Sequence, residues 1–469
     1  MGLAVRYADI IPYTSVFLDC SFTDILHGLH ESIRSAEQED VRRELLQNLH
    51  HLFVTEKNPN PTIVCLAART AFDLFLRVSE FPPGSEIIFT AINIPDMAKI
   101  ARENGLKVVP CDLDLHTMGP KLDLLESLIT CRTVAVLAAH LFGRWFDVKP
   151  VIQIAQKHNL KVIEDCAEGF CGLDRLGDPY SDLTLFSFGP IKFFTALGGG
   201  VAKVRDRSAL EKMEELHDSY AIQSSEIYFQ KLLKCAAIFL LLNIPLIIKP
   251  AMLLTDRLNI DHKSKVVNML RGFPTDLLRR LRHRPPMALL ALLLRRMRSV
   301  EEVPPGTYTA NGQYIWDKLP DGVGKFGMSA LANNFWLFPV LVEDPKVVSL
   351  ELNRIGIDAY IGASQLNVVQ PEFETFSSSA STLPVFDEDS TPLLAEEGAV
   401  KQEKVFLSPF PQTAKFFMDH VIYLPVNRMV STEYLQKMSD GIAKVINCVA
   451  PSAFSFPPNS DSAFFSAKI

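Results

Sequence analysis

One lysine stands apart because of its surroundings. Lys192 lies in SDLTLFSFGPIKFFTALGGGVAKV (181–204), between a strand-like run with several phenylalanines and three consecutive glycines. An amine among aromatic rings is poorly solvated, which lowers its pKa and makes it a nucleophile suited to condensation with an aldehyde. Ser187 could bind a phosphate of the same ligand, and the glycines at 198–200 let backbone approach closely. Taken alone, Lys192 would fit a lysine in a surface loop better.

Two further segments could serve the same ligand. Asp165 ends the apolar run LKVIED (160–165), where a carboxylate is costly unless it pairs with a cation such as a protonated heterocyclic nitrogen. In LAART (66–70), a predicted strand-to-helix turn, the helix amides and the Thr70 hydroxyl could hold a phosphate. The simpler alternatives are that Asp165 and Thr70 each cap the helix that follows.

The elements that must position these residues alternate along the chain. Strand-like segments such as TIVCLAA (62–68) and LKVVPCDLD (106–114) are separated by helix-like segments such as PDMAKIARENG (95–105). This alternation predicts an α/β fold with a mostly parallel sheet covered on both faces. Ligands of such folds bind beyond the carboxyl ends of the strands, so the three candidate segments would meet at one edge of the sheet.

Together, these pieces look like a pyridoxal 5'-phosphate (PLP) site, and the chain resembles the DegT/DnrJ/EryC1/StrS family of sugar aminotransferases. The resemblance runs from about residue 61 to 205, through IAQKHNLKVIEDCAEGFCG (154–172) and SFGPIKFFTALGGGVAKV (187–204). It resumes faintly at GIDAY (356–360) and HVIYLPVN (420–427). It implies the aspartate-aminotransferase-like fold (fold type I) of PLP-dependent transferases, with a small C-terminal α/β domain.

The resemblance also implies a function and a role for each candidate residue. The protein would move an amino group, with glutamate as donor, to a keto substrate such as a nucleotide-linked keto-sugar, and would be a homodimer with sites at the subunit interface. Lys192 would carry the cofactor as a Schiff base, and Asp165 would keep the pyridine nitrogen protonated. No metal site is implied. The other implied cofactor-binding residues are Ala68, Arg69, Thr70, His140, Glu168 and Ser187.

Several positions depart from the family pattern. Glu168 stands where the family has Gln or His, and its carboxylate would repel the cofactor's phenolate unless it is protonated or turned away. Arg69 replaces a glycine, either as a further phosphate ligand or as a solvated helix start. INI (92–94) stands where an aromatic ring would stack on the cofactor. These departures motivate an alternative function, a catalytically inactive scaffold at a membrane surface, which the intact lysine and aspartate oppose.

Composition shifts divide the chain into five predicted segments. Residues 227–300 form the most unusual one, because apolar runs alternate with basic ones such as LLRRLRHR (277–284). Either this insert lies on an anionic membrane surface, through 229–300, or it forms a buried dimer interface with a basic rim; a spanning helix is a third option. The family resemblance implies that Arg282 or Arg284 would reach a phosphate in the partner subunit. The segments are an extended lead-in with a helix over 32–53 (1–57), a large cofactor-binding domain (58–226), the insert (227–300), a small C-terminal domain (301–450) with a mobile loop (371–405), and a disordered tail (451–469).

The overall composition narrows the functional classes. The formal net charge of −7 does not favour nucleic-acid binding, because nucleic acids are also negatively charged. The eight cysteines form no CxxC pair, which fits reduced thiols and a cytoplasmic location, with membrane association if the insert contacts lipid. No G-x-G-x-x-G follows the first predicted strand, so a nicotinamide-binding Rossmann enzyme is excluded.

Overall fold

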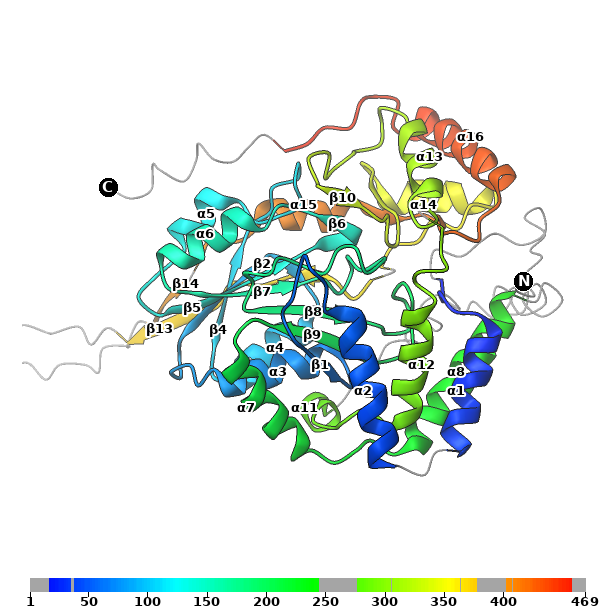
Figure 1. The fold of residues 1–469 in the computed structure, drawn as a ribbon. Coiled ribbons are helices and arrows are strands. Elements are labelled where there is room, and N and C mark those ends of the chain that lie inside the picture. The colour runs from blue at the N-terminus through cyan, green and yellow to red at the C-terminus, as the bar shows by residue number, and fades with distance from the viewer. Residues whose placement is uncertain are drawn as a thin grey trace, which may run out of the picture.

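The computed structural model has a seven-stranded sheet at its centre (Figure 1). The strand order is β1-β9-β8-β7-β5-β2-β4, and every neighbouring pair is parallel except those that β9 makes with β1 and β8. The predicted α/β fold with a mostly parallel sheet is therefore confirmed. The structure describes residues 17–34, 38–243, 276–304, 306–362, 364–377, 402–406 and 408–457. The strands are β1 (Thr62–Cys65), β2 (Glu86–Thr90), β4 (Lys107–Cys111), β5 (Thr133–Ala139), β7 (Lys161–Asp165), β8 (Leu183–Ser187) and β9 (Gly200–Val204).

The carboxyl ends of three adjacent strands are in register. Ala139 of β5 pairs with Asp165 of β7, which pairs with Leu185 of β8. Because these strands are parallel, the residues at or just after their ends, including His140 and Ser187, lie along one edge of the sheet. The sheet thus brings candidate residues from separate motifs together.

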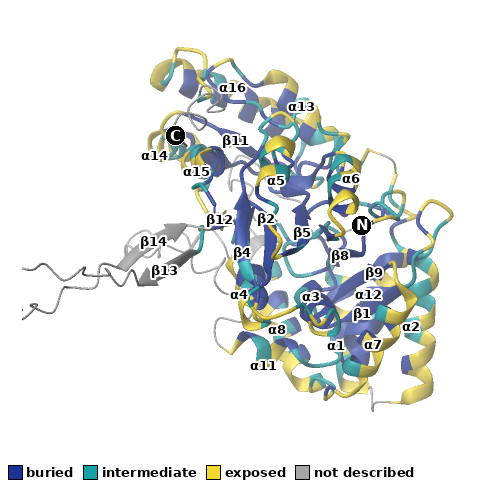
Figure 2. Ribbon diagram, turned by 90° about the vertical axis from the view of Figure 1, so that its left-hand side faces the viewer, coloured by how far each residue is buried: buried dark blue, intermediate teal, exposed yellow. Residues whose placement is uncertain are grey.

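Helices cover both faces of the sheet, whose strands are buried in Figure 2. On β5, Ala135 and Leu137 belong to one cluster of buried side chains, and Val136 and Ala138 belong to another, as the alternation along a strand requires. Side chains of α3, α4 and α7 join the first cluster, and those of α5 and α6 join the second. These helices are α3 (Ala68–Val78), α4 (Pro95–Glu103), α5 (Leu122–Ser127), α6 (Lys149–Lys157) and α7 (Arg207–Asp218).

A layer of four helices packs beside the β1 edge of the sheet (Figure 1). α8 packs along α1, α1 contacts α12, and α12 contacts α2. Gly28 of α1 permits the close approach, because a β carbon there would lie 3.1 Å from side-chain atoms of both Leu232 and Leu292. The four helices are α1 (Phe22–Arg34), α2 (Glu39–Phe53), α8 (Ser225–Asn243) and α12 (Met287–Arg298), and the short α11 (Leu277–Leu281) precedes α12.

Helix α1 corrects the prediction of extended chain before residue 32. The chain is already helical from Phe22, because Ser21 and Asp24 cap this end reciprocally. The amide of Asp24 donates to Ser21 Oγ (3.1 Å), and the amide of Ser21 donates to Asp24 Oδ2 (2.9 Å). The spacing of the two residues is that of a capping box, a local signal that the sequence contained.

A smaller α/β unit completes the described chain. Strand β11 pairs with β15 in antiparallel fashion, and α16 packs on α13 and α14. Short pairs join this part to the large sheet region: β6 with β10, and β3 with β12. The elements are β3 (Ile92–Asn93), the 3₁₀ helix η1 (Leu141–Gly143), β6 (Arg144–Trp145), α13 (Ala310–Lys318), β10 (Ala332–Asn333), β11 (Pro339–Leu341), α14 (Pro345–Arg354), β12 (Asn367–Val368), α15 (Gln412–His420), β15 (Val421–Tyr423) and α16 (Thr432–Val449).

Two segments predicted to lack fixed structure are partly ordered. The two ends of the predicted loop 371–405 form an antiparallel hairpin of β13 (Phe373–Ser377) and β14 (Gln402–Phe406) (Figure 1). In the predicted tail, the amide of Phe454 donates to Asp321 O (2.9 Å), so the prediction of disorder is wrong for 451–457. Residues 378–401 and 458–469 lie outside the described residues.

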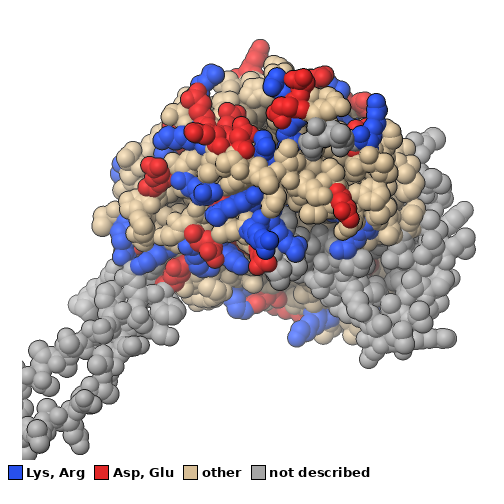
Figure 3. Space-filling view, turned by 90° about the horizontal axis from the view of Figure 1, so that it is seen from below, with Lys and Arg blue, Asp and Glu red and all other residues tan. Residues whose placement is uncertain are grey.

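The arginines predicted to reach a partner subunit are bound within the chain. Arg282 donates to both carboxylate oxygens of Asp73 (2.9 and 3.0 Å), and Arg284 pairs with Asp218 (3.2 Å). A contact of either arginine with a partner subunit stays a prediction. On the face seen in Figure 3, other basic side chains also lie next to acidic ones.

Across the parts of the chain that the structure describes, every helix is too short or too polar to cross a membrane. Residues 244–275 of the predicted insert lie outside those parts. The choice between a membrane-surface helix and a dimer interface for 229–300 stays a prediction.

Candidate active site

The predicted site residues surround a cavity of about 670 Å³ at the carboxyl ends of the strands. Seven of the eight line it, and Thr70 does not. The Thr70 hydroxyl is fully buried and donates to Leu281 O (2.9 Å), so it points toward α11. The seven lining residues are Ala68, Arg69, His140, Asp165, Glu168, Ser187 and Lys192.

Lys192 is held between an acid and an aromatic ring. Its Nζ lies 3.6 Å from Glu168 Oε1 and 3.9 Å from the centre of the Trp336 ring. Burial lowers the pKa of Lys192, and the carboxylates of Glu168 and Asp165 oppose this only in part. A lowered pKa leaves more of the amine neutral near pH 7, as a nucleophile requires.

The loop that carries Lys192 is fixed by contacts from three distant segments. The indole of Trp336 donates to Ile191 O (2.9 Å), and the amide of Phe194 donates to Asp19 Oδ2 (2.6 Å). Arg296 of α12 donates to Thr195 O (3.1 Å). Phe194 has a φ of 50°, a conformation that a non-glycine residue holds only when its surroundings enforce it. The amine therefore has a defined position.

Asp165 is a carboxyl group in need of a partner. Its Oδ1 accepts a hydrogen bond from the amide of Ala167 (3.0 Å), a bond that stabilises the charged form. Burial nevertheless raises the pKa of Asp165, because desolvation outweighs this bond and the positive charge of Lys192. A cationic N–H donor in the cavity would reverse that balance and keep the carboxylate charged.

Glu168 faces Lys192 rather than turning away. Its Oε2 accepts a hydrogen bond from the amide of Phe142 (2.9 Å), and its Oε1 points toward the amine. Burial raises the pKa of Glu168. Since the pKa of Lys192 is lowered, the two pKa values approach one another, and a proton can pass between the acid and the amine.

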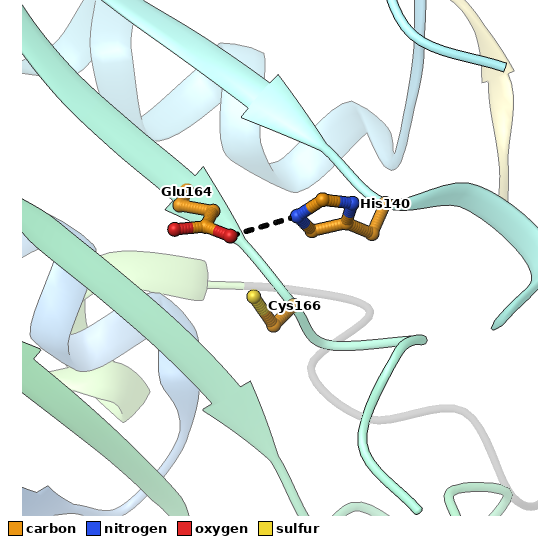
Figure 4. A group of neighbouring side chains, drawn as sticks. All are labelled: His140, Glu164 and Cys166. Atoms are coloured by element: carbon orange, nitrogen blue, oxygen red, sulfur yellow. Dashed lines mark hydrogen bonds and ion pairs between the residues drawn. The ribbon is translucent and has the colours of Figure 1, made fainter. Parts of the chain in front are cut away.

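His140 is braced by a buried carboxylate (Figure 4). Its Nε2 lies 2.8 Å from Glu164 Oε1, and Cys166 lies beside the pair. The other Glu164 oxygen accepts hydrogen bonds from the amide of Asp178 and the hydroxyl of Ser181, both at 2.8 Å. Because Glu164 already satisfies its lone pairs within the protein, the group fits a structural brace better than a metal site.

The amino-terminal end of α3 meets the glycine run. Ala67 at the N-cap position offers no side-chain cap to this helix. A β carbon on Gly200 would lie 2.2 Å from the amide nitrogen of Ala68, so only glycine allows this approach. Arg69 forms an ion pair with Asp96 of α4 and is 17% exposed, which disfavours the solvated helix start. The uncapped helix end leaves a place for an anion.

Sequence reasoning missed many residues of the cavity, and two of them, Trp336 and Lys231, bear on its chemistry. Trp336 comes from NNFWLFPV (333–340), whose aromatic density was the available signal, and the φ angles of Phe335 and Leu337 beside it are positive. Lys231 comes from α8. No local motif marks Lys231, because its place depends on how α8 packs against α1.

Part of the chain is similar in sequence to known aminotransferases. The profile of the DegT/DnrJ/EryC1/StrS aminotransferase family matches residues 58–233. GDP-perosamine synthase of Caulobacter vibrioides is 34% identical over 161 residues, which cover 33% of this chain and 42% of that protein. The 3-oxo-glucose-6-phosphate:glutamate aminotransferase of Bacillus subtilis is 35% identical over 202 residues, covering 43% of this chain and 45% of that protein. The matched parts thus span less than half the length of these curated relatives.

Solved structures agree over much more of the chain. PseC of Helicobacter pylori, described as an aminotransferase involved in pseudoaminic acid biosynthesis, matches with a TM-score of 0.62 and 16% identity, covering 93% of this chain and 100% of that one. DesI in the presence of its TDP-sugar product matches with a TM-score of 0.59 and 17% identity, over 96% and 95%. At these identities the likeness concerns the fold, and it confirms the predicted fold type I.

Proposed function

We propose that the protein is a PLP-dependent aminotransferase acting on a keto-sugar, because residues 58–233 match the profile of the DegT/DnrJ/EryC1/StrS aminotransferase family. The observation that carries the proposal is the cavity amine. Lys192 has a lowered pKa, a fixed loop and an acid 3.6 Å away, at the carboxyl ends of the strands. Glutamate is the proposed donor, and a sugar linked to a nucleotide or phosphate is the proposed acceptor, as in the names of the relatives.

The cavity residues fit this cofactor on three counts. Asp165 is a buried carboxyl group that lacks a cationic donor, which a pyridinium N–H would supply. The uncapped end of α3 and Ser187 can receive a phosphate. Lys192 can bond to an aldehyde. The Trp336 ring centre lies 3.9 Å from the amine, whereas the positions at 92–94 carry no aromatic side chain.

The chain's own residues have distinct tasks in the proposed reaction. When bound, PLP supplies an aldehyde that accepts the amino group and a ring that stabilises negative charge on the carbon losing a proton. Lys192 Nζ takes a proton from the α carbon of glutamate and returns it to the carbon on the other side of the amino nitrogen. Asp165 holds the proton of the ring nitrogen. Glu168, next to the amine, holds or releases a proton at Oε1 as Lys192 changes its charge.

Absorbance tests the proposal directly. The wild-type protein loaded with PLP should show a visible band that disappears when glutamate is added and returns with a keto-sugar phosphate or nucleotide keto-sugar. Lys192→Ala should lack the band. A band that ignores glutamate would contradict the proposed donor, and a protein that takes up no PLP would contradict the catalytic proposal and favour the scaffold alternative.

The proposed assembly and domain boundaries are tested separately. A homodimer with sites at the subunit interface predicts twice the chain mass in native mass spectrometry. Limited proteolysis should cleave near 226–300 and 371–405 and leave the segment from 58 to 226 intact.

A further inference from the structure

The helix α8 presents one face to the cavity at regular spacing. Tyr228, Lys231 and Cys235 line it, and steps of three and four residues place them on the same side of the helix. The Tyr228 hydroxyl donates to Ala196 O (2.7 Å) in the loop that follows Lys192. Next to this face, Leu232 is fully buried and packs against Gly28 of α1. Lys231 is therefore brought to the cavity by a helix that is held by the Tyr228 hydrogen bond and by its packing on α1.

The ammonium of Lys231 sits over the glycine run. A β carbon on Gly198 would lie 3.4 Å from Lys231 Nζ. The next residue, Gly199, donates to Leu66 O (3.1 Å) and bridges to Ala67, immediately before the first turn of α3. The cation thus lies on the same side of the cavity as the uncapped amino-terminal end of α3, whose helix dipole also favours an anion.

The cations of the cavity differ in their partners. Arg69 pairs with Asp96, and Lys192 lies beside Glu168. The acidic residues that line the cavity are Asp165 and Glu168, both at the strand ends. Among the described residues, Lys231 has neither an ion pair nor a hydrogen-bond acceptor for its ammonium, and burial lowers its pKa to about 8. A partly buried ammonium without a counter-ion is a place for a bound anion.

We propose that Lys231, together with the amino-terminal end of α3, binds a phosphate monoester in this cavity. The inference rests on the proposed function for the identity of the ligand, which is either the phosphate of the cofactor or the phosphate of a sugar substrate. We define the helical wall of the cavity as Ile227, Lys231 and Lys234 of α8 with Arg280 of α11. Lys234 and Arg280 add positive charge near the site, and Lys231 makes the contact.

The first experiment compares two cofactor forms that differ only in the phosphate. PLP and pyridoxal are titrated into the wild type, Lys231→Met, Lys231→Arg and the control Lys212→Met, which removes an exposed lysine of α7. If Lys231 binds the cofactor phosphate, Lys231→Met weakens PLP binding about 10- to 100-fold, as expected for loss of a charged hydrogen bond, and leaves pyridoxal binding within about twofold. Lys231→Arg should retain most of the affinity, and unchanged pyridoxal binding shows that the variant is folded.

The second experiment tests the substrate phosphate. Glucose 6-phosphate and glucose are titrated calorimetrically into the same four PLP-loaded proteins. A loss of glucose 6-phosphate binding in Lys231→Met, with PLP affinity unchanged, assigns Lys231 to the substrate. If neither PLP nor glucose 6-phosphate binds Lys231→Met more weakly than the Lys212→Met control, the proposal is overturned.

Failure of the proposed function has a different signature. Inorganic phosphate is titrated into all four proteins without cofactor, with thermal stabilisation as the readout. A wild type that forms no visible band with PLP or pyridoxal contradicts the aminotransferase proposal. In that case, Lys231 is still tested by whether phosphate stabilises the wild type and not Lys231→Met.

Discussion

The cavity has two walls that carry charge in different ways. On the strand-end wall, formed by Asp165, Glu168, Ser187 and Lys192, acids and the amine neutralise one another. The helical wall carries cations, and its described lining residues include no carboxylate. Paired groups with shifted pKa values are suited to moving protons, whereas unpaired cations are suited to holding an anion. The comparison therefore separates chemistry from binding within one cavity.

The walls are also supported differently. The loop of the strand-end wall is bound by polar contacts from the amino-terminal segment, α12 and the small domain. The helical wall depends on the apolar packing of α8 against α1 and on the Tyr228 hydroxyl. A change in the first wall should therefore alter rates or unfold the protein, and a change in the second should mainly alter affinity.

The largest effect is expected from Asp165→Asn. The amide keeps the shape but not the charge that holds the proton of the ring nitrogen, so the half-reaction with glutamate should slow about 10³-fold. Stopped-flow absorbance of the visible band measures this rate. The control Asp174→Asn changes an exposed carboxylate and should keep the wild-type rate. If the rate of Asp165→Asn is within tenfold of this control, the strand-end wall does not have the chemical role assigned to it.

The next effect concerns the support of the lysine loop. Asp19 is 1% exposed and accepts hydrogen bonds from the amide of Phe194 (2.6 Å), the hydroxyl of Tyr308 (2.7 Å) and Nε of Arg428 (2.8 Å). Asp19→Asn should lower the free energy of unfolding by about 3 kcal/mol, because Arg428 and the buried Arg296 each lose a counter-charge. Urea denaturation measures the change. The exposed ion pair of Asp419 provides the control, since Asp419→Asn should cost less than about 1 kcal/mol.

Much of the strand-end wall could be predicted because its signals are local. Asp165, Ser187 and Lys192 lie within one stretch of chain, and the register of parallel strands brings their ends together. The Thr70 hydroxyl shows the limit: its partner, Leu281 O, is 211 residues away, so sequence spacing could not show that it turns from the cavity. Lys231 was missed for the same reason, because packing of α8 on α1 positions it.

Gly198 and Gly200 lie beside different parts of the cavity. Gly198 is next to Lys231 of the helical wall, and Gly200 is next to the first residue of α3. Gly200→Ala would place a β carbon 2.2 Å from Ala68 N and push the end of α3 away, so we expect a loss of about 2 kcal/mol of stability and weaker PLP binding. Gly198→Ala would meet Leu289 and Lys231 at 3.4 Å, a tolerable contact, and should change stability by less than about 1 kcal/mol. Thermal and urea unfolding measure both. Equal losses would contradict the close approach assigned to Gly200 alone.

The smallest effect is a shift in pH dependence. Burial lowers the pKa of Lys192, and the charge of Glu168 works against this by raising it. Glu168→Gln removes that charge, so the pKa of Lys192 should fall further, and the neutral amine should persist to lower pH. When the rate of PLP capture is measured against pH, its fall on the acid side of the profile (the acid limb) should therefore occur at a lower pH than in the wild type. The control Glu211→Gln on exposed α7 should not move the limb. A limb that stays in place in Glu168→Gln would mean that the two groups of the strand-end wall do not interact, and that proton movement there depends on Lys192 without its neighbour.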